Sequence, residues 1–233
     1  MPARDVVLGP IRMPRAIAGL IGATLAVSIL GVMLARAGIV APLEAVPLVP
    51  GAVLRGQLWR LVTWPFLEGE PIGLLFACLM LYWIGRDLVY AWGERAFLLR
   101  FAAIAAGAGA LTTALSFLLP GVSHGAYAGT WAVLDGLIVA WGLLHRGRTI
   151  HLYGIVPVTG IQIVWLTFGL LGLYVVFRGF ASFLPHIIAS LGVLGWLQVY
   201  APWRARTRRA RTRQAARGEA WSFNDWYDKQ TRN

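Results

Sequence analysis

Few side chains in this sequence could do chemistry, and most of them stand within or beside long apolar runs. Asp135 is the one acid inside the core of such a run, where a carboxylate is costly and normally has a partner or a function. A structural hydrogen bond to another helix is the simplest expectation, with Gln162 in the following run as one possible donor. Ser123 and His124 are neighbours in a short loop before the Asp135 run, which is typical of a polar turn rather than of a catalytic pair.

The remaining polar groups predict neither a metal site nor a cofactor site. Glu68 and Glu70 lie two residues apart, but a hydrolytic acid and base would need a shared pocket, so solvation is their expected state. The single cysteine, Cys78, excludes an internal disulfide and any cysteine metal cluster. We therefore expect no metal and no cofactor.

Six apolar runs must position these residues. With 58% hydrophobic and 13% charged residues, the chain lacks the polar surface that a soluble protein of 233 residues needs. A helix requires roughly 20 mostly apolar residues to cross a bilayer. Runs of this kind lie near residues 16–38, 72–92, 97–118, 126–144, 155–177 and 181–201. Because backbone groups in hydrocarbon must bond internally, we predict an all-α membrane protein with six transmembrane helices.

The polar segments divide the chain around this bundle. We predict a cytoplasmic N-terminus at residues 1–15, a six-helix membrane domain at residues 16–201 and a basic cytoplasmic tail at residues 202–233. The outer loop of about residues 39–71 is too long for a simple connection. It mixes aromatic with charged residues, which is typical of a segment that lies at the level of the lipid headgroups.

The arginines predict the orientation and one partner. Of the net charge of +11, much lies in the tail, and the positive-inside rule places both termini in the cytoplasm. We expect the tail to contact anionic lipid rather than nucleic acid. The arginines in question are Arg204, Arg206, Arg208, Arg209, Arg211 and Arg213. Because 20 of the 21 basic residues are arginine, the composition suggests a GC-rich genome and a bacterial inner membrane.

The outer-loop sequence Gly56-Gln57-Leu58-Trp59-Arg60-Leu61-Val62-Thr63 resembles the rhomboid superfamily, whose outer loop carries a Trp-Arg pair in the same setting. Further similarities follow in order at 82–88, 92–95 and 156–158, and at His186 near the start of the sixth helix. The resemblance covers about residues 16–201. It implies the six-helix fold of the intramembrane serine proteases, with Trp59 and Arg60 as a structural motif.

The resemblance also identifies what is missing. Rhomboid proteases cut transmembrane substrates with a serine in a Gly-x-Ser-Gly motif and a histidine on helix six, and two polar residues of helix two help to bind the oxyanion. Here the serine position holds Ala128, and the helix-two positions hold Gly73 and Ala77. A shift of two residues would put Thr130 at the serine position, with Trp131 in place of a glycine. Losing one oxyanion donor costs about 2.7 to 4 kcal/mol, so these changes predict very little peptidase activity.

The resemblance therefore implies a catalytically inactive, pseudoprotease-like rhomboid that sits in membrane lipid and binds or scaffolds transmembrane clients. Two alternatives stay open. One is a rhomboid-family intramembrane endopeptidase with a nonstandard site of Thr130 and His186, because a threonine can be a nucleophile when a base activates it. The other is a small transporter or channel centred on Asp135.

Overall fold

The computed structural model describes residues 5–8, 11–147, 149–152 and 156–200. The chain divides into two units, Met1–Leu194 and Gly195–Asn233. Of the second unit the structure describes residues 195–200, in which Trp196–Tyr200 form the π-helical turn η4. The arrangement of helices that positions the candidate site belongs to the first unit.

Within the residues that the structure describes, five helices are long and apolar enough to cross a membrane, by length and composition. They are α1 (Arg15–Arg36), the run of α5 (Pro71–Met80), η2 (Leu81–Gly85) and α6 (Arg86–Trp92), then α7 (Glu94–Leu115), α10 (Gly160–Arg178), and the run Ala181–Gln198 that holds η3 (Ala181–Phe183) and α11 (Leu184–Gly195). Hydropathy therefore located these helices to within a few residues. The chain is a multi-pass integral membrane protein.

A sixth apolar helix is shorter than the sequence predicts. The expected fourth span began near residue 126, but α9 runs from Trp131 to Leu144, only 14 residues. The preceding segment is extended: Leu48 and Tyr127 form an isolated antiparallel bridge, and Gly129 has a φ of 110°. A residue with positive φ interrupts a right-handed helix, so the start predicted for this helix is wrong. The expected fifth span is also shortened, because residues 156–159 form a strand before α10.

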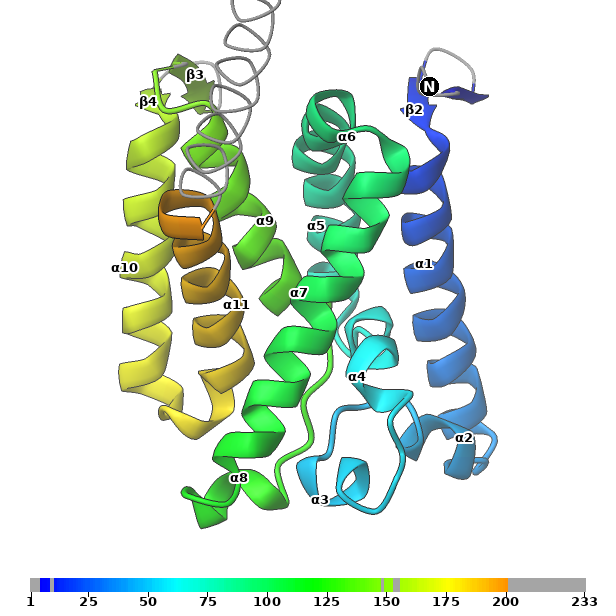
Figure 1. Ribbon diagram of the computed structural model, residues 1–233. Helices are drawn as coiled ribbons and strands as arrows, with labels where there is room; N and C mark the ends of the chain where they lie inside the picture. Colours follow the sequence, from blue (N-terminus) through cyan, green and yellow to red (C-terminus); the bar gives the residue numbers. More distant parts are fainter. Residues whose placement is uncertain (1–4, 9–10, 148, 153–155, 201–233) are drawn as a thin grey trace, which may run out of the picture. The chain divides into compact units, whose positions relative to one another are not determined.

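Short elements gather at the two ends of the helices (Figure 1). At one end lie α2 (Ala41–Glu44), α3 (Pro50–Val53) and α8 (Pro120–Ser123). The helix α4 (Arg60–Thr63) and the 3-10 turn η1 (Trp64–Phe66) lie further into the bundle, where the indole of Trp64 donates to the carbonyl of Ala105 in the middle of α7. At the other end lie two antiparallel hairpins, β1 (Asp5–Leu8) with β2 (Ile11–Pro14) and β3 (Thr149–Leu152) with β4 (Val156–Thr159). The α1–α5 connection thus begins at the end that also holds α8 and then reaches between the helices.

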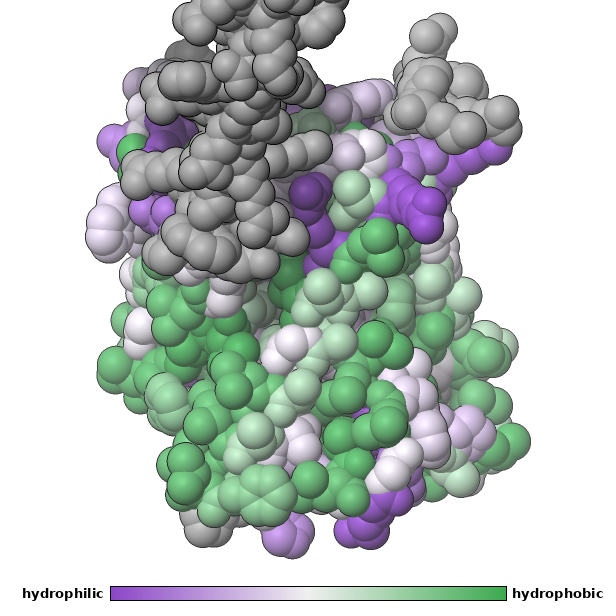
Figure 2. Space-filling view, in the orientation of Figure 1, coloured by the Kyte–Doolittle hydropathy of each residue, from purple (hydrophilic) through white to green (hydrophobic). Residues whose placement is uncertain are grey.

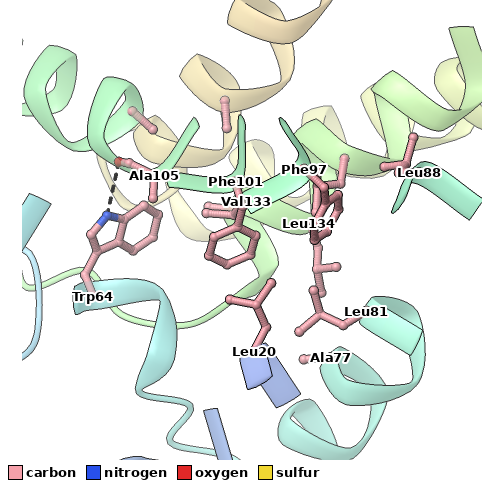
Figure 3. Packing of buried hydrophobic residues seen from close by; sticks show 14 of the residues in the cluster. Leu20, Trp64, Ala77, Leu81, Leu88, Phe97, Phe101, Ala105, Val133 and Leu134 are labelled. Carbon is pink, nitrogen blue, oxygen red and sulfur yellow. Dashed lines mark hydrogen bonds between the residues drawn. The ribbon is translucent and has the colours of Figure 1, made fainter. Parts of the chain in front are cut away.

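The core lies between α1, α5, α7 and α9, where side chains from each helix interdigitate (Figure 3). Leu20 and Phe101 face the middle of the cluster, and Leu81 and Leu134 extend it toward α6. On the space-filling face of Figure 2, hydrophobic residues cover the middle and hydrophilic residues gather toward the ends. Apolar side chains that stay exposed in this way suit a bundle whose surroundings are lipid.

Glycines bring α9 and α10 close together. A Cβ built on Gly142 would meet the carbonyl oxygen of Gly160 and the side chain of Val164, and one built on Gly160 would meet the carbonyl oxygen of His145. Small residues at such crossings let helix backbones approach, which increases van der Waals contact in lipid. This contact fixes α10 beside the helix that carries Asp135.

Candidate functional site

Three segments far apart in the sequence converge at the outer-loop end of α9. We call residues Trp64–Glu68 the sealing segment. Its Trp64 carbonyl accepts a hydrogen bond from the amide of Gly129 at 3.1 Å. The hydroxyl of Tyr127 donates to the carbonyl of Ala181 at 3.0 Å, which ties the start of α9 to the turn before α11. Most of the candidate residues lie around this junction.

Asp135 and His186 form a pair between α9 and α11. Oδ2 of Asp135 lies 2.7 Å from Nδ1 of His186, and the two side chains are 19% and 21% exposed. An acid and an imidazole that share a hydrogen bond need not be solvated separately in an apolar bundle. Asp135 thus bonds to another helix as expected, but Gln162 is not the partner, because its Oε1 accepts from the amide of Thr159 at 2.8 Å in a capping box at the start of α10.

The pair resembles part of a general-base arrangement. A carboxylate on one imidazole nitrogen holds the ring and leaves the other nitrogen, Nε2, free to accept a proton. The ring of Phe183 packs against the imidazole with the ring centroids 5.0 Å apart. Within the described ranges, however, Asp135 is the only side chain hydrogen-bonded to His186. No hydroxyl or thiol in that part of the chain is bonded to His186 as a nucleophile would be.

Thr130 makes its side-chain hydrogen bond elsewhere. Its hydroxyl is fully buried and donates to the carbonyl of Pro65 in the sealing segment at 2.7 Å. The hydroxyl thus satisfies a buried backbone carbonyl of the 3-10 turn η1, which would otherwise lack this donor. In this arrangement Thr130 connects the outer loop to α9, and its proton is not directed at His186.

The positions that resemble the serine motif carry no reactive group. Ala128 is exposed and has a methyl side chain, and Gly129 adopts its positive φ directly after it. Gly73 and Ala77, at the helix-two positions, have no side-chain donor, and Ala77 is fully buried in the core (Figure 3). These four residues shape the backbone and fill the core, and they supply no oxyanion donor from their side chains.

A carboxylate lies beside the two glycines of this site. A Cβ built on Gly73 would be 3.2 Å from Oε1 of Glu68, and one built on Gly129 would be 3.0 Å from Oε2. The backbone amide of Glu68 donates to the hydroxyl of Ser28 on α1 at 2.9 Å. The expectation that Glu68 is simply solvated is therefore wrong: the side chain is partly buried, whereas Glu70 is exposed.

The surroundings of Glu68 favour its neutral form. Burial raises the pKa of the Glu68 carboxyl above its ordinary value, and the nearby Glu70 raises it further. The backbone amide of Thr130 and the imidazole of His186 oppose this shift and lower the pKa. Oε2 of Glu68 is buried and has no hydrogen-bond partner within the described residues. Glu68 is thus an acid held in a space that solvates its charge incompletely.

The Trp-Arg pair of the outer loop has two different roles. Arg60 is 7% exposed, and its guanidinium donates to Oε1 of Gln57 and to the carbonyl of Pro47, each at 2.6 Å. Trp59 is 51% exposed, and its indole donates to the carbonyl of Ala45 at 3.1 Å. The buried Arg60 side chain therefore joins parts of the loop through hydrogen bonds, whereas the Trp59 side chain lies on the surface of the loop.

The other polar candidates lie apart from this junction. Oγ of Ser123 is 2.7 Å from Nδ1 of His124 at the end of α8, in an exposed turn. Across the described residues, no group of three or more His, Cys, Asp or Glu side chains could hold a metal ion. The six tail arginines expected to contact anionic lipid, from Arg204 to Arg213, lie outside the described residues.

Sequence reasoning placed His186 and Asp135 among the candidates but did not pair them, and it overlooked the position of Glu68. Glu68 follows Pro65 and precedes Pro71 in the loop, so its direction depends on how the loop folds against α9. The available signal was Gly73, since a glycine where the resemblance expects a histidine leaves room for another side chain. That signal shows where space exists, and it does not say which residue fills it.

One comparison with known proteins gives a match. The model of the family described as "Eukaryotic integral membrane protein (DUF1751)" matches residues 18–207, which include nearly all of α1 and every later helix. No curated protein matches the chain. The description agrees with several apolar helices in a multi-pass arrangement. Because it names eukaryotes, it lends no support to the bacterial inner membrane that the arginine content suggested.

Proposed function

The chain belongs to the family of eukaryotic integral membrane proteins labelled DUF1751, and from this premise we propose that it is a rhomboid-like pseudoprotease that binds transmembrane clients without cutting them. One observation carries the proposal. The hydroxyl of Thr130 bonds to Pro65 and the imidazole of His186 bonds to Asp135, so neither group is engaged with the other. A general base without a nucleophile beside it supports binding rather than peptide-bond cleavage.

The outward face of α10 supports a docking place for a client helix. Trp165, Gly169, Gly172 and Val176 repeat at three- and four-residue spacing and therefore share one face of the helix. Trp165 is 71% and Val176 80% exposed, and a Cβ built on either glycine would meet nothing within 4 Å. Two open glycines between larger side chains let another helix approach closely in lipid. A client helix that packs against these glycines would gain van der Waals contact that lipid chains do not provide.

Site-specific photo-crosslinking tests client binding in intact membranes. The probe is a single-pass helix of Leu and Ala with one central Asn, and the photoreactive residue replaces Trp165. We expect a crosslinked product that falls to background in Gly169→Leu together with Gly172→Leu. The matched control is Gly19→Leu with Gly22→Leu on α1, an exposed glycine pair with the same spacing and the same open surroundings, which should leave crosslinking unchanged.

Cleavage assays separate this proposal from the protease alternative. We expect no cleavage of a helical membrane substrate by the parent protein. Cleavage that disappears in both Thr130→Ala and His186→Ala would show that the hydroxyl leaves Pro65 to act as a nucleophile, and it would overturn the proposal. Crosslinking that is equal in the α1 and α10 variants would also count against it, since binding would then not depend on this face.

Topology and lipid contact complete the proposal. We infer that both termini are cytoplasmic, because the basic residues lie mainly on that side of the predicted spans. The tail at residues 202–233 is a separate segment whose six arginines bind anionic lipid. Each arginine contributes about 1 kcal/mol of binding free energy near the membrane surface. The bacterial inner membrane remains a prediction from arginine content. The transporter alternative gains no support from Asp135, whose burial is explained by its pairing with His186.

A further inference from the structure

The sealing segment, Trp64–Glu68, is held on two sides by hydrogen bonds. Toward α9, the Gly129 amide and the Thr130 hydroxyl bond to its first two carbonyls. Toward α1, the hydroxyl of Ser28 donates to the carbonyl of Phe66 at 3.2 Å and accepts from the amide of Glu68 at 2.9 Å. The segment therefore connects the first helix of the bundle to the start of α9.

Glu68 ends this segment and is its one ionisable side chain. Its two carboxyl oxygens lie against Gly73 of α5 and Gly129 before α9, at the distances from the built Cβ positions given above. The titratable groups that act on it come from each neighbouring element. They are Glu70 on the same loop, Cys78 on α5 and His186 on α11, with Asp135 of α9 paired to that histidine.

We propose that Glu68 is a proton-controlled latch, which holds the sealing segment against α9 when its carboxyl group is protonated and releases the segment when it is ionised. Release would break the contacts of the segment with Gly129 and Thr130. The latch goes beyond the proposed function, since it holds whether or not the protein binds clients.

The direction of the pH effect follows from the burial of the carboxyl group. In the seated state its pKa is raised above 4.5, so that state binds the proton more tightly than the released state does. The advantage of the seated state is fully present below the pKa of a free glutamate and is lost as the pH rises through the raised pKa.

Hydrogen exchange measured by mass spectrometry tests the latch in the full chain in nanodiscs. The amide of Gly129 reports seating, because it donates to Trp64. The amide of Gly179 donates to Val175 at the end of α10 and serves as an internal reference for the pH dependence of exchange itself. We expect the Gly129 to Gly179 exchange ratio to rise with pH above about 4.5 by up to tenfold per pH unit, then to level off.

The variant Glu68→Gln cannot ionise and should keep this ratio constant across the same range. The control Glu44→Gln removes an exposed acid from the same loop and should keep the rise seen in the parent protein. A ratio that is constant with pH in the parent protein overturns the latch, and this readout does not require any variant to fold. A rise of the same size in Glu68→Gln assigns the pH response to another group and likewise overturns it.

Discussion

Asp135 and His186 lie 51 residues apart in the sequence, and their side chains meet with Oδ2 and Nδ1 at 2.7 Å. The pair connects α9 to α11 at the level where the outer loop closes over the bundle. It therefore has a structural value that does not depend on catalysis.

A double-mutant cycle measures that value. Asp135→Ala and His186→Ala each remove one partner, and the double variant removes both. We expect a coupling energy between about 0.6 and 1.7 kcal/mol, the mean and the maximum measured for hydrogen bonds between helices in a membrane protein. Steric-trapping measurements of the unfolding free energy in bicelles give the four values. Single-variant effects that simply add would mean that the observed contact contributes nothing.

Thr130 is expected to act through its bond to Pro65. Thr130→Val keeps the shape of the side chain but leaves the buried Pro65 carbonyl without its donor, which should cost about 1 to 3 kcal/mol of stability. Thr130→Ser keeps a hydroxyl and should recover most of the loss. Thermal unfolding in the same detergent compares the three proteins. Equal stability of the Val and Ser variants would contradict a structural role for this hydroxyl.

Arg60 should contribute more to stability than Arg55, the exposed arginine of the same loop. Arg60→Ala leaves Gln57 and the Pro47 carbonyl without a charged donor, so we expect a loss of about 2 to 3 kcal/mol. Arg55→Ala removes an exposed arginine of the same loop and should change stability by less than about 0.5 kcal/mol. Limited proteolysis of the loop compares the two variants with the parent protein. We expect faster cleavage in Arg60→Ala and no change in Arg55→Ala.

The contact of α9 with α10 should be intolerant of a single methyl group. In Gly142→Ala the new Cβ meets the backbone of Gly160, which is not flexible, and the helices must separate. Overpacking of this kind costs about 1 to 3 kcal/mol. Gly22→Ala on α1 meets nothing within 4 Å and should be neutral or slightly stabilising. A Gly142→Ala protein that unfolds at the parent temperature would show that the helices can adjust.

Hydropathy and length predicted most of the fold. The expected spans at 16–38 and 72–92 differ by one or two residues from the helices Arg15–Arg36 and Pro71–Trp92. The start of α9 could not be predicted in this way, because Ala126 and Ala128 are apolar but belong to an extended segment. Backbone conformation there depends on the pairing of Tyr127 with Leu48, a contact between two connecting segments far apart in the sequence.

The site was less predictable for the same reason. A sequence shows that Asp135 needs a partner, but the choice between Gln162 and His186 depends on which helix lies beside α9. Gln162 was nearer in the sequence, yet it caps its own helix. Glu68 was assigned to solvent because loops are usually exposed, and its direction depends on bonds from Ser28 and Thr130 that no local pattern encodes.

The shortness of α9 has a consequence for how the protein enters its membrane. Fourteen residues reach about 21 Å, less than the roughly 30 Å of hydrocarbon that a spanning segment must cross. Such a short helix gains little free energy from transfer into the bilayer alone. The extended residues before it also need hydrogen-bond partners for their backbone groups. Insertion of α9 therefore depends on two other parts of the chain. The outer loop must already be in place to pair with the extended residues before α9, and α10 must leave the ribosome to pack against it. Biogenesis of this protein should be cooperative across helices, and a ribosome stalled just after α9 should leave that helix uninserted.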